Sequence, residues 1–196
     1  MANQALSTTR AHIRLYLAVT AAESVLDDPI FPPAWLGMVA AVRQCLASGG
    51  KILTIGNGGS HCHALHLAEE LTGRYVQSRA PIAAICIDGG AAHLTCVSND
   101  FGFDEVYERM VKALAKPGDV LVIFSTSGMS NNLVLAALAM KAAKGEVVVF
   151  LGKDGGKLAR MTFAGRGYVV PSYSSAEIQE VHQILLHALV EEIEAE

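Results

Sequence analysis

Hydrophobic residues follow two different patterns along the chain. Up to about residue 48 they recur at helical spacing, which predicts one helix over about 6–26, capped by Ser7, and a second over about 34–47. Prolines at 29, 32 and 33 separate the two, because proline lacks an N–H and restricts the residue before it. The pair Gly49 and Gly50 predicts the end of the second helix.

From Lys51 onward, short apolar runs alternate with helical segments. The runs at 51–55, 82–87, 120–124 and 147–151 have the length and β-branched content of strands buried on both faces, and 167–170 is a weaker fifth. Helices are predicted between and after them, over about 60–74, 91–115, 131–144 and 175–195. This order predicts an α/β fold: a doubly wound parallel sheet of about five strands flanked by helices, with an N-terminal helical arm.

Composition adds bounds on size and partners. The 196 residues, 52% hydrophobic and 17% charged, suit one domain over 1–196, with helices in 1–48 and an α/β core in 49–196. The net charge of −4 and the lack of any lysine or arginine run argue against nucleic acid as a partner. No apolar stretch reaches the length of a membrane span, and no secretory signal is visible. Four cysteines without a CxxC pair predict reduced thiols in a cytoplasmic protein.

Small polar residues directly follow three of the predicted strands, at 57–60, 125–130 and 152–156. Ligands of open parallel sheets bind beyond the carboxyl ends of the strands. The first loop is a glycine turn before a helix, which aims backbone N–H groups at one point where a phosphate or carboxylate can be held. The second carries four hydroxyls just before a helix, as a phosphate site without arginines requires. Its plainer interpretation is a polar turn that caps the helix at Ser130.

Histidines and glutamates occupy two of the predicted helices. His66 and Glu70 are four residues apart and share one helical face, as an acid/base pair, a metal-binding pair or a solvated pair. His61 and His63, nearer the loop, equally suit solvent. His182 lies in an apolar run and is expected to be a core residue. Gln179 and His187 are separated by about 12 Å along one helix. Both can serve one ion only if that helix bends or another subunit contributes.

Seven short motifs occur in a characteristic order over most of the chain. They are Gly56-Asn-Gly-Gly-Ser60, His66-Leu-Ala-Glu-Glu-Leu-Thr-Gly-Arg74, Asn99-Asp-Phe-Gly-Phe103, Pro117-Gly-Asp-Val120, Ser125-Thr-Ser-Gly128, Gly152-Lys-Asp-Gly-Gly156 and Ile178-Gln-Glu-Val-His182 with His187. Each motif is weakly specific alone, but together the chain resembles the sugar isomerase (SIS) domain. Within that group it resembles the phosphoheptose isomerases, also called sedoheptulose 7-phosphate isomerases.

The resemblance implies a role for each matching residue. Glu70 and His187 correspond to the acid/base pair, and one zinc ion per site would be held by His66, Glu70, Gln179 and His187. The implied substrate-binding residues are Asn57, Gly58, Gly59, Ser60, Arg74, Asn99, Asp100, Ser125, Thr126, Ser127, Ser130 and Gln179. The hydroxyls of the second loop would hold the phosphate, with Arg74 reaching it from a neighbouring subunit. The family also implies a homotetramer with sites at subunit contacts.

The implied activity is an aldose–ketose isomerase that interconverts sedoheptulose 7-phosphate and D-glycero-D-manno-heptose 7-phosphate through an enediol. Two alternatives remain, a non-catalytic SIS module that binds a sugar phosphate or a protein, and an isomerase of another sugar phosphate. The non-catalytic relatives that associate with replication initiators lack the counterparts of Glu70 and His187, which are present here. Three departures from the usual family pattern, at 89–92, Ala176 and His63, bear on the choice of sugar.

Overall fold

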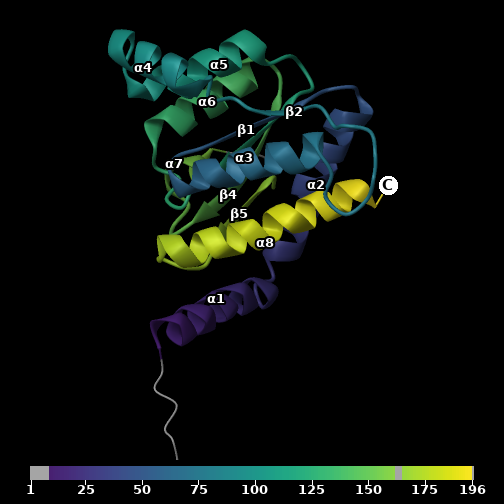
Figure 1. The fold of residues 1–196 in the computed structure, drawn as a ribbon, viewed down its shortest axis with the longest axis vertical. Coiled ribbons are helices and arrows are strands. Elements are labelled where there is room, and N and C mark those ends of the chain that lie inside the picture. Colours follow the sequence, from purple (N-terminus) through teal and green to yellow (C-terminus); the bar gives the residue numbers. More distant parts are fainter. Residues whose placement is uncertain (1–8, 162–164, 196) are drawn as a thin grey trace, which may run out of the picture.

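The core of the protein is a five-stranded sheet in which every pair of neighbouring strands is parallel (Figure 1). The computed structural model describes residues 9–161 and 165–195. The strand order is β2-β1-β3-β4-β5, with β1 Ile52–Gly56, β2 Ala84–Cys86, β3 Val120–Phe124, β4 Glu146–Gly152 and β5 Gly167–Val170. The predicted fold class and the weaker fifth strand are therefore confirmed.

Helices cover both faces of this sheet, as the continuous apolar runs require. On one face α2 (Phe31–Ala47), α3 (Gly59–Thr72) and α8 (Ser175–Glu194) pack on strand residues such as Val122 and Phe124. On the other face α4 (Gly90–Asp100), α5 (Val106–Leu114) and α6 (Asn131–Ala142) pack on residues such as Leu121 and Ile123. Successive residues of β3 thus alternate between two cores.

Three element boundaries differ from the sequence prediction. The single helix expected over 91–115 is wrong, because the chain breaks after α4 and continues through the 3-10 turn Phe103–Glu105 into α5. Gly102 lies at the break with φ 96°, a conformation that does not propagate a helix. The short helix α7 (Gly156–Arg160) was not predicted, and α2 begins at Phe31 because prolines are tolerated in a first turn.

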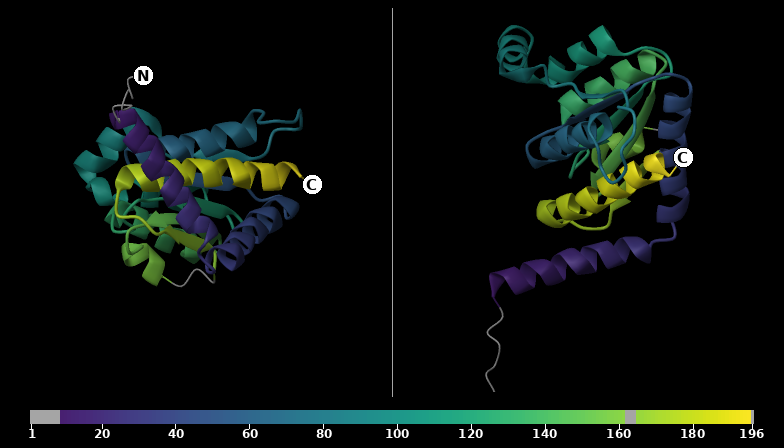
Figure 2. Two further views of the ribbon diagram at one scale, coloured as in Figure 1. Left: turned by 90° about the horizontal axis from the view of Figure 1, so that it is seen from below. Right: turned by 45° about the vertical axis from the view of Figure 1, so that its right-hand side comes forward.

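Helix α1 (Arg10–Leu26) forms the arm and stands away from the sheet beneath α8 (Figures 1 and 2). Thr9 caps it through a side-chain bond from the His12 amide, whereas the predicted cap Ser7 lies outside the described residues. Arg14 joins the arm to the body by pairing with Glu177 and Glu180 on α8. Many apolar side chains of α1 remain exposed: Ile13, Leu15, Tyr16, Leu17, Val19 and Leu26.

Among the described residues, no single helix is long and apolar enough to cross a membrane. Only α1 and α2 taken together, with an 85° bend between them, meet the length and composition criteria.

His182 is a core residue, as its apolar surroundings predicted. It is fully buried, and its Nε2 lies 2.9 Å from the carbonyl oxygen of Leu151 in β4, to which it donates. Burial disfavours the imidazolium and lowers the pKa of His182 from 6.5 to about 4.

This burial predicts an acid-sensitive fold. Between pH 6.5 and 4 the unfolded chain binds a proton at residue 182 that the folded chain does not, so the free energy of unfolding falls as pH falls. The slope from this residue reaches up to about 1.4 kcal/mol per pH unit. Urea unfolding at several pH values measures it. In His182→Gln, which keeps a donor for Leu151 but cannot titrate, the slope should be shallower. An unchanged slope would contradict this account.

Candidate active site

Two of the predicted loops meet where the strand order reverses. Strands β1 and β3 are neighbours, with Gly56 in register with Phe124, although they are connected through β2 at the sheet edge. In open α/β sheets this switch point is where ligands bind. Asn57, just after β1, and Asn132, at the start of α6, exchange two amide hydrogen bonds of 3.0 and 2.9 Å. The loop after β1 is therefore fixed to the helix that follows the serine loop.

The glycine loop brings α3 against α8. Gly58 has φ 55° at the N-terminus of α3, a conformation that favours glycine. At the next residue, a Cβ on Gly59 would lie 2.7 Å from Nε2 of Gln179 on α8, so a larger residue there would displace the Gln179 amide from its position. Ser60 is buried beside them. The first loop thus positions Gln179 at the switch point.

The serine loop leaves polar groups facing a small hollow. Ser125 Oγ accepts from the Gly128 amide (3.0 Å), and Ser127 Oγ accepts from the Met129 amide (3.3 Å), which fixes the turn. Ser130 occupies the cap position of α6, but its hydroxyl makes no capping bond to the helix, unlike the plainer interpretation of this turn. The hollow has a volume of about 80 Å³ and is lined by Asn57, Ser60, Phe124, Ser125, Thr126, Ser127, Ser130, Leu133 and Gln179. Hydroxyls at a helix N-terminus in a space of this size suit one phosphate group.

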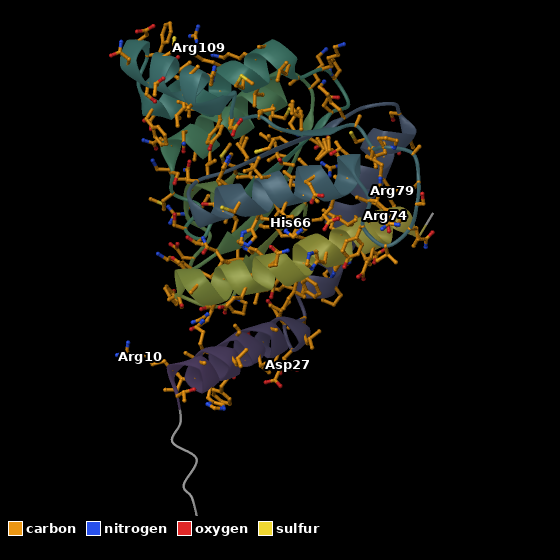
Figure 3. All side chains as sticks on the ribbon, viewed as in Figure 1. Arg10, Asp27, His66, Arg74, Arg79 and Arg109 are labelled. Carbon is orange, nitrogen blue, oxygen red and sulfur yellow. The ribbon has the colours of Figure 1, made fainter. Side chains whose placement is uncertain are left out.

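His66 and Glu70 do not form a solvated pair, because they meet His187 from α8. His66 Nε2 lies 3.0 Å from Glu70 Oε1, and one ligand atom from each of the three residues falls within 4.8 Å of the others. His66 points from α3 toward α8 in Figure 3. Two imidazoles and a carboxylate at this separation are a ligand set that suits zinc. The structure therefore brings the two predicted proton-transfer residues and one more predicted ligand to one place.

Two neighbours of this cluster were missed by sequence reasoning. Gln183 lies one turn before His187 on α8, and its Nε2 is 3.0 Å from both His66 Nδ1 and His187 Nε2. Tyr75 follows α3, and its ring stacks on His187 with centroids 5.4 Å apart. The four-residue spacing from His187 was a signal that could have identified Gln183. Nothing in the local sequence indicated Tyr75.

A second hollow shares Gln179 with the first. It has a volume of about 350 Å³ and is lined by Gly59, His63, Ala176, Gln179, Glu180 and Gln183. Gln179 lines both hollows, and Gln183 touches both histidines of the cluster. Burial lowers the pKa of His63, with the nearby His66 adding to the shift, so this ring stays neutral near pH 7. Gln179 and Gln183 therefore link the hydroxyl-lined hollow to Glu70 and His187, and we call this row of side chains the substrate path.

Helix α8 runs without a break from Ser175 to Glu194, so bending does not bring Gln179 to His187. The two lie at opposite ends of the path, about 12 Å apart along the helix. Arg74 is exposed beyond the far end of α3, while the serine loop lies at its beginning (Figure 3). Asn99 and Asp100 end α4, where they are exposed and hydrogen-bonded to each other. These three do not line the serine-loop hollow of their own chain.

The departure at 89–92 lies beside the first loop. Gly90 and Ala91 line a hollow of about 370 Å³ together with Asn57, Gly58 and His61. His61 Nε2 lies 3.3 Å from Asp88 Oδ2, so this region contains a carboxylate just before the departure. Burial raises the pKa of the adjacent Cys86 to about 11, so its thiol stays protonated.

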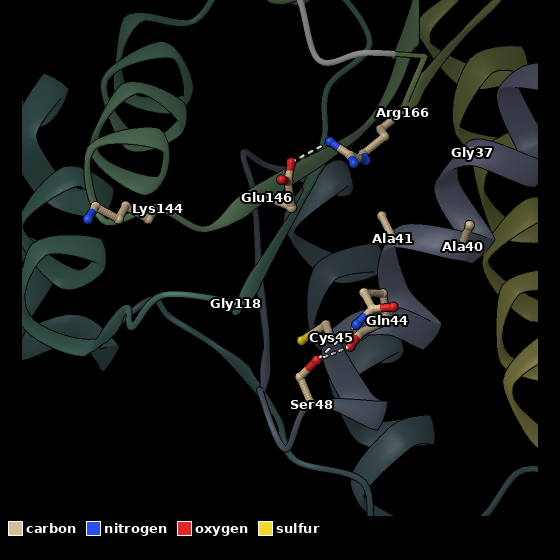
Figure 4. A pocket seen from close by; sticks show the side chains of 10 residues that line it. All are labelled: Gly37, Ala40, Ala41, Gln44, Cys45, Ser48, Gly118, Lys144, Glu146 and Arg166. Carbon is tan, nitrogen blue, oxygen red and sulfur yellow. Dashed lines mark hydrogen bonds and ion pairs between the residues drawn. The ribbon is translucent and has the colours of Figure 1, made fainter.

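A larger hollow, of about 570 Å³, lies at the opposite ends of the strands (Figure 4). Its lining includes Gly118, which precedes β3, Glu146, which begins β4, and Arg166, which precedes β5. These are the amino ends of the strands, where open parallel sheets do not place their ligands. The hollow between the carboxyl ends is therefore the stronger candidate.

Arg79 holds the far ends of the two site helices together. Its Nη1 and Nη2 donate to the carbonyl oxygens of Leu71 and Glu70, each at 2.8 Å, and its Nε donates to Glu194 on α8 at 3.0 Å. The bond to Glu70 satisfies a carbonyl that the end of α3 leaves free, whereas the Leu71 carbonyl also accepts from the Ile82 amide at 3.0 Å. One arginine thus ties the helix that carries Glu70 to the helix that carries His187.

This clamp predicts a difference between two arginines. Arg79→Met should lower the midpoint of thermal unfolding by about 4–8 °C, because the Glu70 carbonyl loses its donor, and the Leu71 carbonyl and the Glu194 carboxylate each lose one of theirs. Arg74→Met is the matched control, since Arg74 is exposed and should shift the midpoint by no more than about 2 °C. Calorimetry of both variants measures the difference. Equal midpoints would show that the clamp contributes nothing to stability.

The comparisons with known proteins agree with this geometry. The SIS domain family matches residues 37–152. A phosphoheptose isomerase of Glaesserella parasuis is 42% identical over 93% of this chain and 96% of the relative. One from Yersinia pestis is 49% identical over 76% of each chain. A solved phosphoheptose isomerase from Francisella tularensis superposes with a TM-score of 0.89 at 30% identity, covering 95% of this chain and 97% of the other. The chain belongs to the SIS-domain family and, within it, to the phosphoheptose isomerases.

Proposed function

We propose that this protein is an isomerase that interconverts sedoheptulose 7-phosphate and D-glycero-D-manno-heptose 7-phosphate. The observation that carries the proposal is the row of side chains that leads from the serine loop, through Gln179 and Gln183, to Glu70 and His187. A phosphate bound at the serine loop would leave two groups able to move protons at the other end of this row. The names of the relatives point to the same activity.

The length of the path fits a seven-carbon sugar. An extended chain advances about 1.2 Å per bond, so the phosphorus of a 7-phosphate lies about 8–9 Å from C2. Gln179, beside the serine loop, and His187 are about 12 Å apart along α8, which leaves room for one contact at each end. The spacing that argued against a shared metal ion is therefore the spacing expected of residues at opposite ends of one substrate.

The reaction moves protons between adjacent carbons and their oxygens. A base removes a proton from C1 of the ketose while an acid donates one to the C2 oxygen, which gives the enediol. Protonation at C2 and loss of the O1 proton then give the aldose, so no oxidant or reductant is consumed. Glu70 and His187 are the groups placed for these transfers, and general acid–base catalysis of this kind contributes about 10²–10⁴ in rate. Their meeting in one cluster disfavours a non-catalytic module.

The same cluster fits a zinc ion. His66, Glu70 and His187 offer two nitrogens and a carboxylate within 4.8 Å, and a catalytic zinc needs three protein ligands and an open position. When bound, the ion polarises the carbonyl or fixes the sugar oxygens. Gln179 can be a fourth ligand only from another subunit, because α8 is unbroken. In its own chain, Gln179 serves the substrate path.

A homotetramer would complete the site. The exposed apolar residues of α1, among them Leu15 and Tyr16, form a surface that a second copy could cover. Arg74 is exposed, and it makes no hydrogen bond or ion pair within the described part of its own chain. Its side chain is therefore available to a neighbour's serine loop. Both features support the expectation of sites built at subunit contacts.

Substrate length separates this proposal from its alternatives. The protein is mixed with sedoheptulose 7-phosphate, fructose 6-phosphate or ribulose 5-phosphate, and aldose formation is followed by NMR. We expect the highest kcat/KM for the seven-carbon sugar, because each missing carbon shortens the span by about 1.2 Å. Faster conversion of a shorter sugar would show that the protein is an isomerase of that other sugar phosphate. Binding without any conversion would indicate a non-catalytic module.

A further inference from the structure

Gln183 is in contact with both histidines of the cluster, and no role has been assigned to it. Its amide nitrogen lies 3.0 Å from His66 Nδ1 and 3.0 Å from His187 Nε2, and its amide oxygen lies 3.3 Å from the same His66 Nδ1. The side chain is half-buried and also lines the substrate path. A single amide thus presents a donor and an acceptor to one ring nitrogen of His66.

The other ring nitrogen of His66 faces a carboxylate. Nε2 lies 3.0 Å from Glu70 Oε1, a separation at which two unprotonated acceptors repel each other. Either a proton or a cation must therefore lie between them, and a proton is held by the imidazole nitrogen, because an imidazole is a stronger base than a carboxylate. In a neutral imidazole, the state of Nε2 dictates the state of Nδ1.

The metal-free and metal-bound states of His66 require opposite hydrogen-bonding roles of Gln183. With a proton on Nε2, His66 Nδ1 carries a lone pair and accepts from the Gln183 amide nitrogen, whose second hydrogen goes to His187 Nε2. With a cation on Nε2, Nδ1 carries the proton and needs an acceptor, and the Gln183 oxygen is within reach. Metal-binding histidines generally donate their other N–H to an acceptor of this kind.

We propose that Gln183 is a positioning residue for the metal cluster, whose amide fixes the His66 tautomer by donating to Nδ1 in the metal-free state and accepting from it in the loaded state. This inference rests on the proposed zinc site. Gln179 cannot take this role in the same chain, because it lies one helical turn earlier beside the serine loop. Tyr75 contacts the cluster through its ring face, and its hydroxyl is bound to Glu191 at 3.1 Å.

Zinc affinity of the metal-free protein tests the proposal without any substrate. We expect Gln183→Met, which keeps the shape of the side chain but neither donates nor accepts strongly, to bind zinc about 10–100-fold more weakly in competition with a chromophoric chelator. Gln183→Glu keeps an acceptor for Nδ1–H and should bind at least as tightly as the unchanged protein. Gln44→Met, on an exposed glutamine of α2, is the matched control and should not change affinity.

The ring nitrogens give a readout that a purely structural role would not move. Nitrogen-15 NMR of histidine-labelled protein should find His66 protonated at Nε2 without zinc and at Nδ1 with zinc. Wild-type affinity and an unchanged His66 tautomer in Gln183→Met would overturn the role of Gln183 alone. Failure of the unchanged protein to take up zinc would overturn both this role and the proposed metal site, while leaving the isomerase assay to judge the activity separately.

Discussion

Glu70→Gln should lose about 10²–10⁴ of kcat for sedoheptulose 7-phosphate while keeping the fold. Glutamine preserves the length of the side chain and can still meet His66 Nε2, 3.0 Å away, but it cannot accept a proton. The carboxylate sits at the end of the substrate path, beside His187. Initial rates from the NMR assay, with unfolding curves recorded in parallel, measure the effect.

Glu69→Gln is the matched control for this change. Glu69 is the preceding residue on α3; it is exposed and is not one of the three clustered residues. It should keep kcat within about twofold of the unchanged protein. If Glu70→Gln also stayed within that range, Glu70 would have no part in the proton transfer.

His187→Asn should lower kcat by a similar factor of about 10²–10⁴, because the second proton-transfer group is then missing. Residues that act as a unit are not additive, so the double variant Glu70→Gln, His187→Asn should be about as slow as the slower single variant. Rates of the two single variants and the double variant measure this. His12→Asn, on α1, provides a histidine control far from the cluster.

Additive losses in the double variant would argue that the two residues act in separate steps. Activity of His187→Asn within about threefold of the unchanged protein would remove His187 from the reaction altogether. The second result would leave the clustering of His187 with His66 and Glu70 as a feature of metal binding alone.

The sheet could be predicted because its strands are buried on both faces. The run over 120–124 is continuous in Val, Leu, Ile and Phe, and β3 has the same bounds in the structure. The helix over 91–115 was predicted as one piece because its apolar spacing continues past Gly102, where a single φ of 96° ends α4. Hydrophobic periodicity indicates which face of a helix is buried, but it does not detect a local change of backbone direction.

The residues at the two ends of the candidate site could be predicted from the sequence, but Gln183 between them could not. The serine loop and the pair His66 and Glu70 follow from strand ends and helical spacing. Gln183 was missed because a glutamine within an apolar helix resembles an ordinary surface position, and only the approach of α3 to α8 brings it to both histidines. Gly59 leaves room for the Gln179 amide against the first turn of α3.

The most direct test of the proposed isomerisation is to incubate the purified protein with sedoheptulose 7-phosphate, with and without added zinc, and to follow the aldose by NMR. The account predicts formation of D-glycero-D-manno-heptose 7-phosphate at a rate that falls by at least about 10² in Glu70→Gln. Absence of the aldose in both zinc conditions, from protein with a cooperative unfolding transition, would contradict it.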